Sequence, residues 1–341
     1  MAEPILEIRD LTVEFSTEDG IVRAVTGVSY DLMPGEVLGI VGESGSGKSV
    51  SMLTVLGLTP IPPGRIASGE ALYKGNDLLK MPKRELRNLR GGELAMIFQD
   101  PMTSLNPVFT IGDQIMEALQ THNPGMKDDT AKARTIELLS SVGVPFAERR
   151  VDQYPHEFSG GMRQRAMIAM AMANNPSVLI ADEPTTALDV TIQAQIVEVI
   201  KAAQEHTHAA IVLITHDLGL IAELADRVVV MYAGRVVEIG DVYTIFDSPR
   251  HPYTIGLMNS LARVDTDLER LIPIPGQPPS MLNPPPGCAF HPRCTHSQGR
   301  EVCRTEIPAL RAAEGGAEHR SACHFAEELA GVRAPIAAGA D

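Results

Sequence analysis

A glycine-rich stretch near the start of the chain, GESGSGKS, has the residue types and spacing of a phosphate-binding loop. Its glycines let backbone amides turn towards phosphate oxygens, Lys48 is placed to reach the β- and γ-phosphates, and the Ser49 hydroxyl can ligate Mg²⁺. The stretch follows EVLGIV, a buried-strand pattern, and precedes VSMLTVLGL, a helix pattern. This order favours a nucleoside triphosphate site over a plain glycine turn. The predicted binding residues are Gly42, Glu43, Ser44, Gly45, Ser46, Gly47, Lys48 and Ser49.

Two adjacent carboxylates follow a second buried strand, in the stretch SVLIADEP. Because α/β proteins bind ligands at the carboxyl edge of the sheet, we expect Asp182 and Glu183 at that edge. Asp182 fits the role of a Mg²⁺ ligand, and Glu183 that of the base that polarises the water attacking the γ-phosphate. Alone, such a pair is more typical of a helix cap or a solvated turn. Together with the phosphate loop it favours the catalytic interpretation.

Two further stretches place polar groups at the ends of elements. EFSGGMRQRAMIAMAMANNP begins with a serine and paired glycines and continues as an Ala/Met-rich helix, whose methionines are interpreted as core filler. Ser159, Gly160 and Gly161 are therefore expected at a helix N-terminus, a second place where an anion can bind. His216 ends another buried strand, IVLITHDL, where its side chain could contact the γ-phosphate.

The elements around these motifs indicate an α/β fold in a chain of 341 residues, of which 44% are hydrophobic. Residues 100–176 lack the alternation of strand and helix, and DDTAKARTIELLSSVG within them reads as a helix with an Asp cap and a terminating Gly143. We therefore predict an ATPase-like core over 1–262 with a helical subdomain at about 100–176. Residues 263–341 are expected to form a proline-rich connector and a Cys-rich C-terminal region.

Composition narrows the setting of the protein. The N-terminus lacks the pattern of a signal peptide, and no apolar run approaches the roughly 20 residues of a membrane helix, so we expect a cytosolic chain. A net charge of −14 disfavours a broad nucleic-acid-binding face. Disulfides are rare in a reducing cytosol, so clustered cysteines there are more typical of metal sites or catalysis.

The four cysteines all lie in the C-terminal region, at Cys288, Cys294, Cys303 and Cys323. Their spacing matches neither a C-x-x-C zinc ribbon nor a ferredoxin run. Four thiolates suit a [4Fe–4S] cluster or a structural Zn²⁺ ion, and a short proline-rich segment needs such a cross-link to hold its shape. Free buried thiols are the third interpretation.

The motifs together resemble the ATP-binding subunits of ABC transporters, a family of P-loop NTPases with a RecA-like core. The resemblance rests on the phosphate loop, IFQDP with Gln99, the signature FSGGM, VLIADE, TALD and THD, in that order. The usual signature reads LSGGQ, so Phe158 and Met162 depart from it while its serine and glycines remain. The family also implies ATP as the substrate and an adenine-stacking aromatic, for which Phe15 is the candidate.

The resemblance further implies roles for the motif residues. Gln99 would link Mg²⁺ and the attacking water to the membrane subunits, and would hold Mg²⁺ with Ser49 and Asp182. His216 would be the switch histidine, and Asp189 would lie in a loop that crosses a dimer interface. The signature helix of one subunit would face ATP bound to the other, so that two chains close around two nucleotides.

Two stretches, IFQDPMTSLNPVFTIGDQI and SPRHPYT, are similar to the dipeptide and oligopeptide (peptide/nickel) import branch of this family. That branch implies two membrane permease subunits, a second and paralogous ATPase subunit, an extracytoplasmic substrate-binding protein, and a peripheral position on the cytoplasmic face of the membrane. Its C-terminal C-x-F-x-x-R-C region favours the [4Fe–4S] cluster over Zn²⁺. The alternatives are a soluble ABC-type ATPase of nucleic-acid maintenance and a P-loop kinase, although a kinase needs neither FSGGM nor His216.

Overall fold

The computed structural model describes residues 3–100, 104–186, 190–260, 273–313 and 318–331. The chain divides into two compact units, each built from several segments. Unit 1 consists of Met1–Leu6, Leu32–Val37 and Tyr73–Ile214. Unit 2 consists of Glu7–Asp31, Leu38–Leu72 and Thr215–Asp341.

Unit 1 contains three neighbouring parallel strands, in the order β8 (Ala210–Ile214), β7 (Val178–Asp182) and β6 (Leu94–Ile97). Val178 lies opposite both Leu94 and Ala210, which fixes the register of the three strands. Every residue of β7 and β8 is buried, as the continuous apolar sequences of parallel strands predict. Asp182 is therefore a buried carboxylate at the carboxyl end of an otherwise apolar strand.

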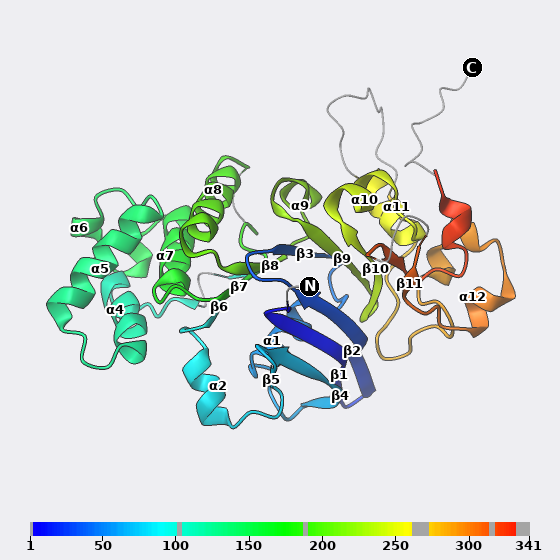
Figure 1. Cartoon of the computed structure of the whole chain (residues 1–341), viewed down its shortest axis with the longest axis horizontal. Helices are drawn as coiled ribbons and strands as arrows, with labels where there is room; N and C mark the ends of the chain where they lie inside the picture. The colour runs from blue at the N-terminus through cyan, green and yellow to red at the C-terminus, as the bar shows by residue number, and fades with distance from the viewer. Residues whose placement is uncertain (1–2, 101–103, 187–189, 261–272, 314–317, 332–341) are drawn as a thin grey trace, which may run out of the picture. The chain divides into compact units, whose positions relative to one another are not determined.

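The helices of unit 1 include the expected helical subdomain, labelled α4 to α7 in Figure 1. Helices α4, α5 and α7 pack against one another through buried apolar faces. Thr110 and Asp113 form a capping box that fixes the start of α4. The α-helices described in unit 1 are α2 (Lys83–Leu89), α4 (Ile111–His122), α5 (Asp128–Ser141), α6 (Ala147–Arg150), α7 (Gly160–Met172) and α8 (Val190–Thr207). The unit also contains the short strand β5 (Asn76–Asp77) and the 3-10 helix η1 (Pro155–Glu157).

Unit 2 contains two groups of strands. In the first, β1 (Leu6–Thr17) lies between β2 (Gly20–Leu32) and β4 (Gly64–Tyr73). In the second, β3 (Val37–Val41) pairs in parallel with β9 (Arg227–Tyr232), which pairs antiparallel with β10 (Arg235–Asp241). The helices of unit 2 are α1 (Lys48–Val55), α9 (Leu218–Leu224), α10 (Val242–Asp247), α11 (Pro252–Asn259) and α12 (Glu301–Thr305), with the short turns η2 (His291–Arg293), η3 (Thr295–Ser297) and η4 (Ala326–Leu329).

The C-terminal region continues the second group of strands. Strand β12 (Arg320–Ser321) pairs antiparallel with β10, with Glu238 opposite Ser321, and β11 (Arg311–Ala312) pairs with β12. The cysteine region is thus joined to β10 by backbone hydrogen bonds. Among the residues that the structure describes, no helix is both long and apolar enough to cross a membrane.

Candidate active site

The phosphate loop of unit 2 has the expected geometry, because β3 ends at Val41 and α1 begins at Lys48. Gly42 has φ +153°, and a Cβ atom there would lie 2.2 Å from the carbonyl oxygen of Met231. Gly47 has φ +98°, and a Cβ atom there would lie 2.4 Å from the carbonyl oxygen of Ala24. Both positions therefore need glycine for their conformation and for space.

Lys48 is buried and bonded to the loop that contains it. Its Nζ donates hydrogen bonds to the carbonyl oxygens of Gly42, at 2.7 Å, and Glu43, at 3.0 Å, and lies 3.5 Å from the hydroxyl of Ser46. These contacts hold the ammonium group inside the loop, where bound phosphate oxygens could accept hydrogen bonds from it. Ser49 follows directly in the first turn of α1, partly exposed.

His216 and Phe15 also lie in unit 2. His216 is exposed and follows Thr215, whose backbone N–H donates to the carbonyl oxygen of Ile40 in β3. The histidine segment therefore runs beside the strand that carries the phosphate loop. Phe15 is partly buried on β1 with its ring against Gly64, so its adenine-stacking role stays a prediction.

Unit 1 brings two of the predicted catalytic residues together. The side-chain Nε2 of Gln99 donates a hydrogen bond of 2.9 Å to Oε2 of Glu183. The hydroxyl of Thr186 donates to the same carboxylate oxygen at 2.8 Å. Glu183 has φ +48°, and its backbone N–H donates to Ile214 at the end of β8. Two donors thus fix the same carboxylate oxygen of Glu183, which directly follows the buried Asp182.

The FSGGM stretch forms the start of α7, as the sequence indicated. Ser159 is the N-cap, and its hydroxyl accepts a hydrogen bond from the backbone N–H of Met162 at 3.3 Å. Ser159 and Gly160 are exposed, whereas a Cβ atom on Gly161 would lie 2.9 Å from the side chain of Ile192. This leaves the helix N-terminus open to a ligand, with a glycine required for its packing against α8.

The predicted site residues divide between the two units. The phosphate loop, His216 and Phe15 belong to unit 2, and Gln99, Asp182, Glu183 and the signature residues belong to unit 1. Asp189 lies outside the described residues. The hydroxyl of Ser49, the amide oxygen of Gln99 and the carboxylate of Asp182 are the hard oxygen donors that suit Mg²⁺, so the donor set fits the expected metal.

The four cysteines of unit 2 are free thiols. Burial, with a smaller contribution from the charges of neighbouring cysteines, raises the pKa of Cys288 to about 11 and that of Cys323 to about 12. Burial also raises the pKa of Cys294 and Cys303. In the described part of the chain, which includes all four, no group of three or more His, Cys, Asp or Glu side chains is arranged to hold a metal ion. The arrangement of these side chains therefore does not support the expected metal site.

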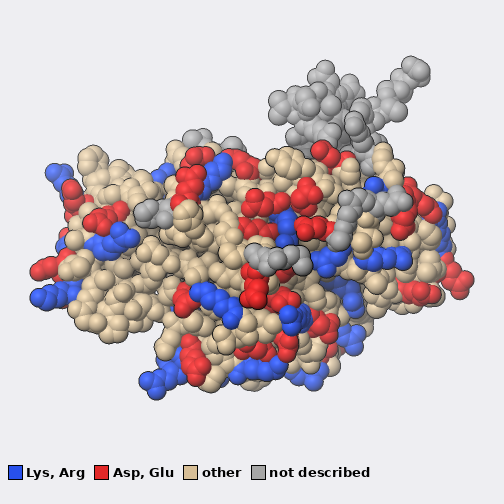
Figure 2. Space-filling view, in the orientation of Figure 1, with Lys and Arg blue, Asp and Glu red and all other residues tan. Residues whose placement is uncertain are grey.

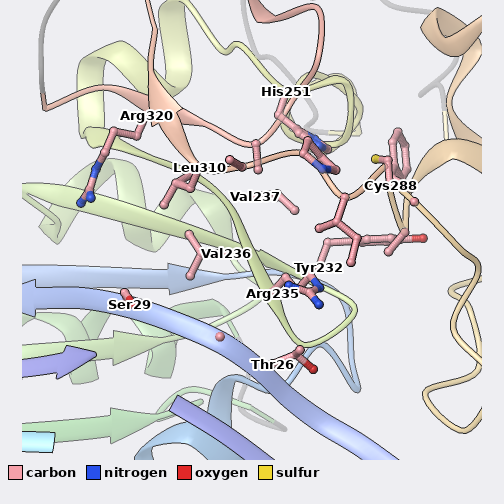
Figure 3. A pocket seen from close by; sticks show the side chains of 18 residues that line it. Thr26, Ser29, Tyr232, Arg235, Val236, Val237, His251, Cys288, Leu310 and Arg320 are labelled. Carbon is pink, nitrogen blue, oxygen red and sulfur yellow. The ribbon is translucent and has the colours of Figure 1, made fainter. Parts of the chain in front are cut away.

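A pocket of about 360 Å³ lies in unit 2 beside the cysteine region. Figure 3 shows Tyr232, Arg235, His251 and Cys288 around it, from β9, β10, the start of α11 and the C-terminal region. None of the residues that line this pocket belongs to the phosphate loop.

Comparison with known proteins identifies the fold and the motifs. Residues 25–186 match the family model described as ABC transporter, and residues 237–303 match the model described as oligopeptide/dipeptide transporter, C-terminal region. The dipeptide transport ATP-binding protein DppD of Escherichia coli (strain K12) is 51% identical over 327 residues, which is 96% of this chain and 98% of that protein. The chain belongs to the ABC transporter family. It is an ATP-binding subunit of that family and an ABC-type ATPase.

Further relatives agree with this assignment of the ABC ATPase. The oligopeptide transport ATP-binding protein OppD of Bacillus subtilis (strain 168) is 54% identical over 294 residues, covering 86% of this chain and 82% of that protein. The dimeric ATP-binding cassette MJ0796, solved in a post-hydrolysis state with ADP and Pi, superposes with a TM-score of 0.62 at 26% identity over 70% of this chain and 98% of that one. The cbiO1 protein of Clostridium perfringens gives a TM-score of 0.60 at 27% identity over 72% of this chain and 91% of that one. The expected ABC fold and family are confirmed.

Sequence analysis of the ABC ATPase overlooked several residues that contact its site. Thr186 follows the acidic pair closely, so its position three residues after Glu183 was a usable signal. Tyr253, from the HPYT segment, and Arg293, from the cysteine region, both contact Glu43 of the phosphate loop. These two lie more than 200 positions from Glu43, and nothing in their local sequence indicates the contact.

Proposed function

We propose that this ABC ATPase hydrolyses ATP to drive the import of dipeptides or oligopeptides through separate membrane permease subunits. The observation that carries the proposal is the nearly full-length identity to DppD of Escherichia coli, a dipeptide transport protein by name. The match to the C-terminal region of oligopeptide/dipeptide transporters supports it independently of the ATPase core. In this function the chain is a peripheral subunit on the cytoplasmic face of the membrane.

For hydrolysis, the phosphate loop binds the triphosphate through its backbone amides and Lys48. Ser49, Gln99 and Asp182 would hold Mg²⁺, which when bound would supply positive charge to neutralise the phosphates. Glu183 accepts the proton of the attacking water, since a carboxylate at this place can act as a general base. The hydrogen bonds from Gln99 and Thr186 aim that carboxylate. Proton acceptance and charge stabilisation together account for the reaction.

The exposed N-terminus of α7 supports a second ATPase subunit as a partner. Ser159 and Gly160 present a hydroxyl and backbone amides to the outside of unit 1, where an anion on another chain can bind them. In the proposed assembly this helix end contacts ATP held by a paralogous subunit, and closure excludes water from the γ-phosphate. Asp189 is proposed to lie at the same interface.

An apolar pocket in unit 1 supports docking of the permease subunits. It encloses about 500 Å³ beside Phe98, whose side chain is 40% exposed next to Gln99. Its lining includes Met96, Phe98, Leu105, His122, Met167 and Met170. Methionine-rich surfaces adapt to apolar partners, so we propose that a permease helix occupies this pocket and moves Gln99 with it. An extracytoplasmic binding protein would deliver the peptide to the permeases.

A growth experiment tests the proposed transport. A strain that needs a dipeptide for an essential amino acid, and lacks the gene for this chain, is supplied with the wild type or with Glu183→Gln. Growth and uptake of labelled dipeptide should return with the wild type alone, because the variant binds ATP without turning it over. Equal uptake in the deletion strain and the complemented strain would contradict the proposal.

The molecules that copurify with this chain distinguish peptide import from nucleic-acid maintenance. On the face shown in Figure 2, Asp and Glu side chains of the described residues lie among the Lys and Arg side chains, whereas nucleic-acid-binding proteins gather basic side chains on one face. Affinity purification from detergent extracts should recover permease subunits. Salt of about 0.5 M screens non-specific ionic contacts with nucleic acid. Recovery of DNA or RNA that survives a wash at this salt concentration would favour the nucleic-acid function instead.

We further propose that Cys288, Cys294, Cys303 and Cys323 take up a [4Fe–4S] cluster. The donor set supports it, since four thiolates match the ligand requirement. Because burial raises the pKa values of these thiols, binding of the cluster would release protons. No step of ATP hydrolysis depends on this group.

Anaerobic purification tests the cluster. A brown protein with iron and sulfide, both lost in Cys294→Ser, is the expected result. Zinc without colour would replace the cluster with a structural Zn²⁺ ion, and a protein without either metal would leave the four cysteines as buried thiols. Neither of these outcomes affects the ATPase assignment.

A further inference from the structure

Glu43 of the phosphate loop is held at two points by other parts of unit 2. Its backbone N–H donates a hydrogen bond of 2.8 Å to the hydroxyl of Tyr253, in α11. Its carboxylate accepts two hydrogen bonds from the guanidinium group of Arg293, Nη1 to Oε2 at 2.6 Å and Nη2 to Oε1 at 3.0 Å. This paired geometry is the strong form of a charge-assisted contact.

The side chain of Arg293 is also held by residues outside the phosphate loop. Its side chain is only 5% exposed, its Nε donates to the carbonyl oxygen of Pro275 at 2.9 Å, and its Nη1 donates to the hydroxyl of Tyr232 at 3.2 Å. The guanidinium carbon also lies 5.8 Å from the ring centre of Tyr232 and 6.0 Å from that of Phe290. The hydrogen bonds to Glu43 raise the pKa of Arg293. The arginine is therefore a preorganised cation, unlike a mobile surface side chain.

Tyr253 is equally constrained. It is fully buried, and its ring lies 4.5 Å from that of Tyr232 and 5.5 Å from that of Phe290, measured between ring centres. Burial raises its pKa, so the hydroxyl stays neutral at physiological pH and can accept the hydrogen bond from Glu43. The three rings join α11, β9 and the C-terminal region in one packed group, and Tyr232 also lines the pocket in Figure 3.

The contact continues from Glu43 into the phosphate loop. The carbonyl oxygen of Glu43 accepts a hydrogen bond from Nζ of Lys48 at 3.0 Å, so the residue held by Arg293 and Tyr253 also holds the phosphate-binding lysine. Glu43 places a carboxylate in a loop that must bind a strongly negative triphosphate. Unpaired, that carboxylate would repel the phosphates, since like charges interact strongly where water is partly excluded.

We propose that Arg293 and Tyr253 are positioning residues for ATP binding: they hold Glu43, neutralise its carboxylate and so set the phosphate loop for the triphosphate. The C-terminal region thereby acts on the ATP site of the same chain. This inference rests on the proposed binding of ATP at the phosphate loop, and it does not depend on which cargo is transported.

Affinity for ATP and steady-state kinetics test the proposal on the full-length chain. Arg293→Ala should raise both the Kd for MgATP and the KM by about tenfold, with a much smaller change in kcat, because a buried pair is broken and Glu43 is left unneutralised. Arg311→Ala, which removes an exposed arginine of β11 in the same region, is the matched control and should leave both constants unchanged. A Kd for Arg293→Ala within about twofold of wild type would overturn the proposal.

A second variant separates positioning from a loss of folding. Adding Glu43→Gln to Arg293→Ala removes the unneutralised carboxylate, so the double variant should recover part of the lost affinity. A double variant as weak as Arg293→Ala would overturn the electrostatic part of the proposal. Tyr253→Phe keeps the ring packing and deletes only the acceptor, so it tests the link even if Arg293→Ala fails to fold, and it should raise the Kd several-fold. Unchanged affinity in Tyr253→Phe would remove Tyr253 from the proposal.

The wild type separates failure of this inference from failure of the proposed function. A wild-type chain that binds no MgATP would contradict the proposed ATP site itself. A wild-type chain that binds MgATP, with Arg293→Ala and Tyr253→Phe binding it equally well, would contradict only the positioning role.

Discussion

Gln99 donates a hydrogen bond of 2.9 Å from its side-chain amide to the carboxylate of Glu183. The two residues lie 84 positions apart, at the ends of the neighbouring parallel strands β6 and β7. The amide donor fixes the position of the carboxylate oxygen Oε2 of the proposed general base. A residue proposed to sense the permease and the proposed general base are therefore in direct contact.

Replacing Glu183 with glutamine tests this contact through catalysis. Glu183→Gln keeps the size of the side chain and removes the base, so kcat should fall by ~10²–10⁴-fold while MgATP still binds. Single-turnover hydrolysis and equilibrium binding measure the two effects. Glu198→Gln, an exposed glutamate of α8, is the matched control and should keep wild-type turnover. Brisk hydrolysis by Glu183→Gln would assign the base to another residue.

Thr186 gives a finer test of how the carboxylate is aimed. Thr186→Val removes the hydroxyl that donates to Glu183 at 2.8 Å and preserves the shape of the side chain. Loss of one such hydrogen bond costs about 1 kcal/mol, so kcat should fall about fivefold with an unchanged Kd for MgATP. Steady-state assays at saturating ATP measure this change. Thr130→Val, at an exposed position of α5, is the control, and equal kcat values for the two variants would show that Thr186 does not aim the base.

Local sequence patterns predicted the active-site elements well, and residues 128–143 show both the strength and the error of such patterns. The sequence indicated a helix with an Asp cap and a terminating glycine. Helix α5 begins at Asp128 itself, so Asp128 and Asp129 lie in its first turn and the N-cap is Lys127. Acidic side chains stabilise either position, the cap by hydrogen bonding and the first turn through the helix dipole, so sequence alone does not distinguish them. Gly143 has φ +75° and ends the helix as predicted.

Contacts between segments far apart in the chain could not be predicted from local sequence patterns. Strand β12 has two residues, too few to show a period, yet it pairs with β10 and joins the C-terminal region to the larger group of strands. Arg293 meets Glu43 across 250 positions, and each reads locally as an ordinary charged residue. Likewise, counting four cysteines predicted a metal ligand set, but their spacing says nothing about where the fold holds each thiol.

The phosphate-loop glycines provide a test of backbone geometry. Gly42→Ala would place a methyl group 2.2 Å from a backbone oxygen, so the loop must shift. The free energy of unfolding should fall by about 2 kcal/mol or more, and MgATP binding should be lost. Gly45→Ala is the control, because no heavy atom of the described residues outside its chain neighbours lies within 4 Å of the added Cβ and only its φ of +77° opposes alanine. Urea unfolding and nucleotide titration compare the two, and equal losses would refute the steric explanation.

Stability should depend on pH through His251. Burial lowers the pKa of this histidine to about 3, and its Nδ1 accepts the backbone N–H of Tyr253. The unfolded chain takes up a proton near pH 6.5 and the folded chain does not, so the stabilisation is complete above pH 6.5 and is lost as the pH falls towards 3. Between pH 8 and 5 this group should cost about 2 kcal/mol of unfolding free energy, measured by urea denaturation. His251→Gln should flatten this dependence and the exposed His156→Gln should not. Matching slopes in all three proteins would show that folding does not lower the pKa of His251.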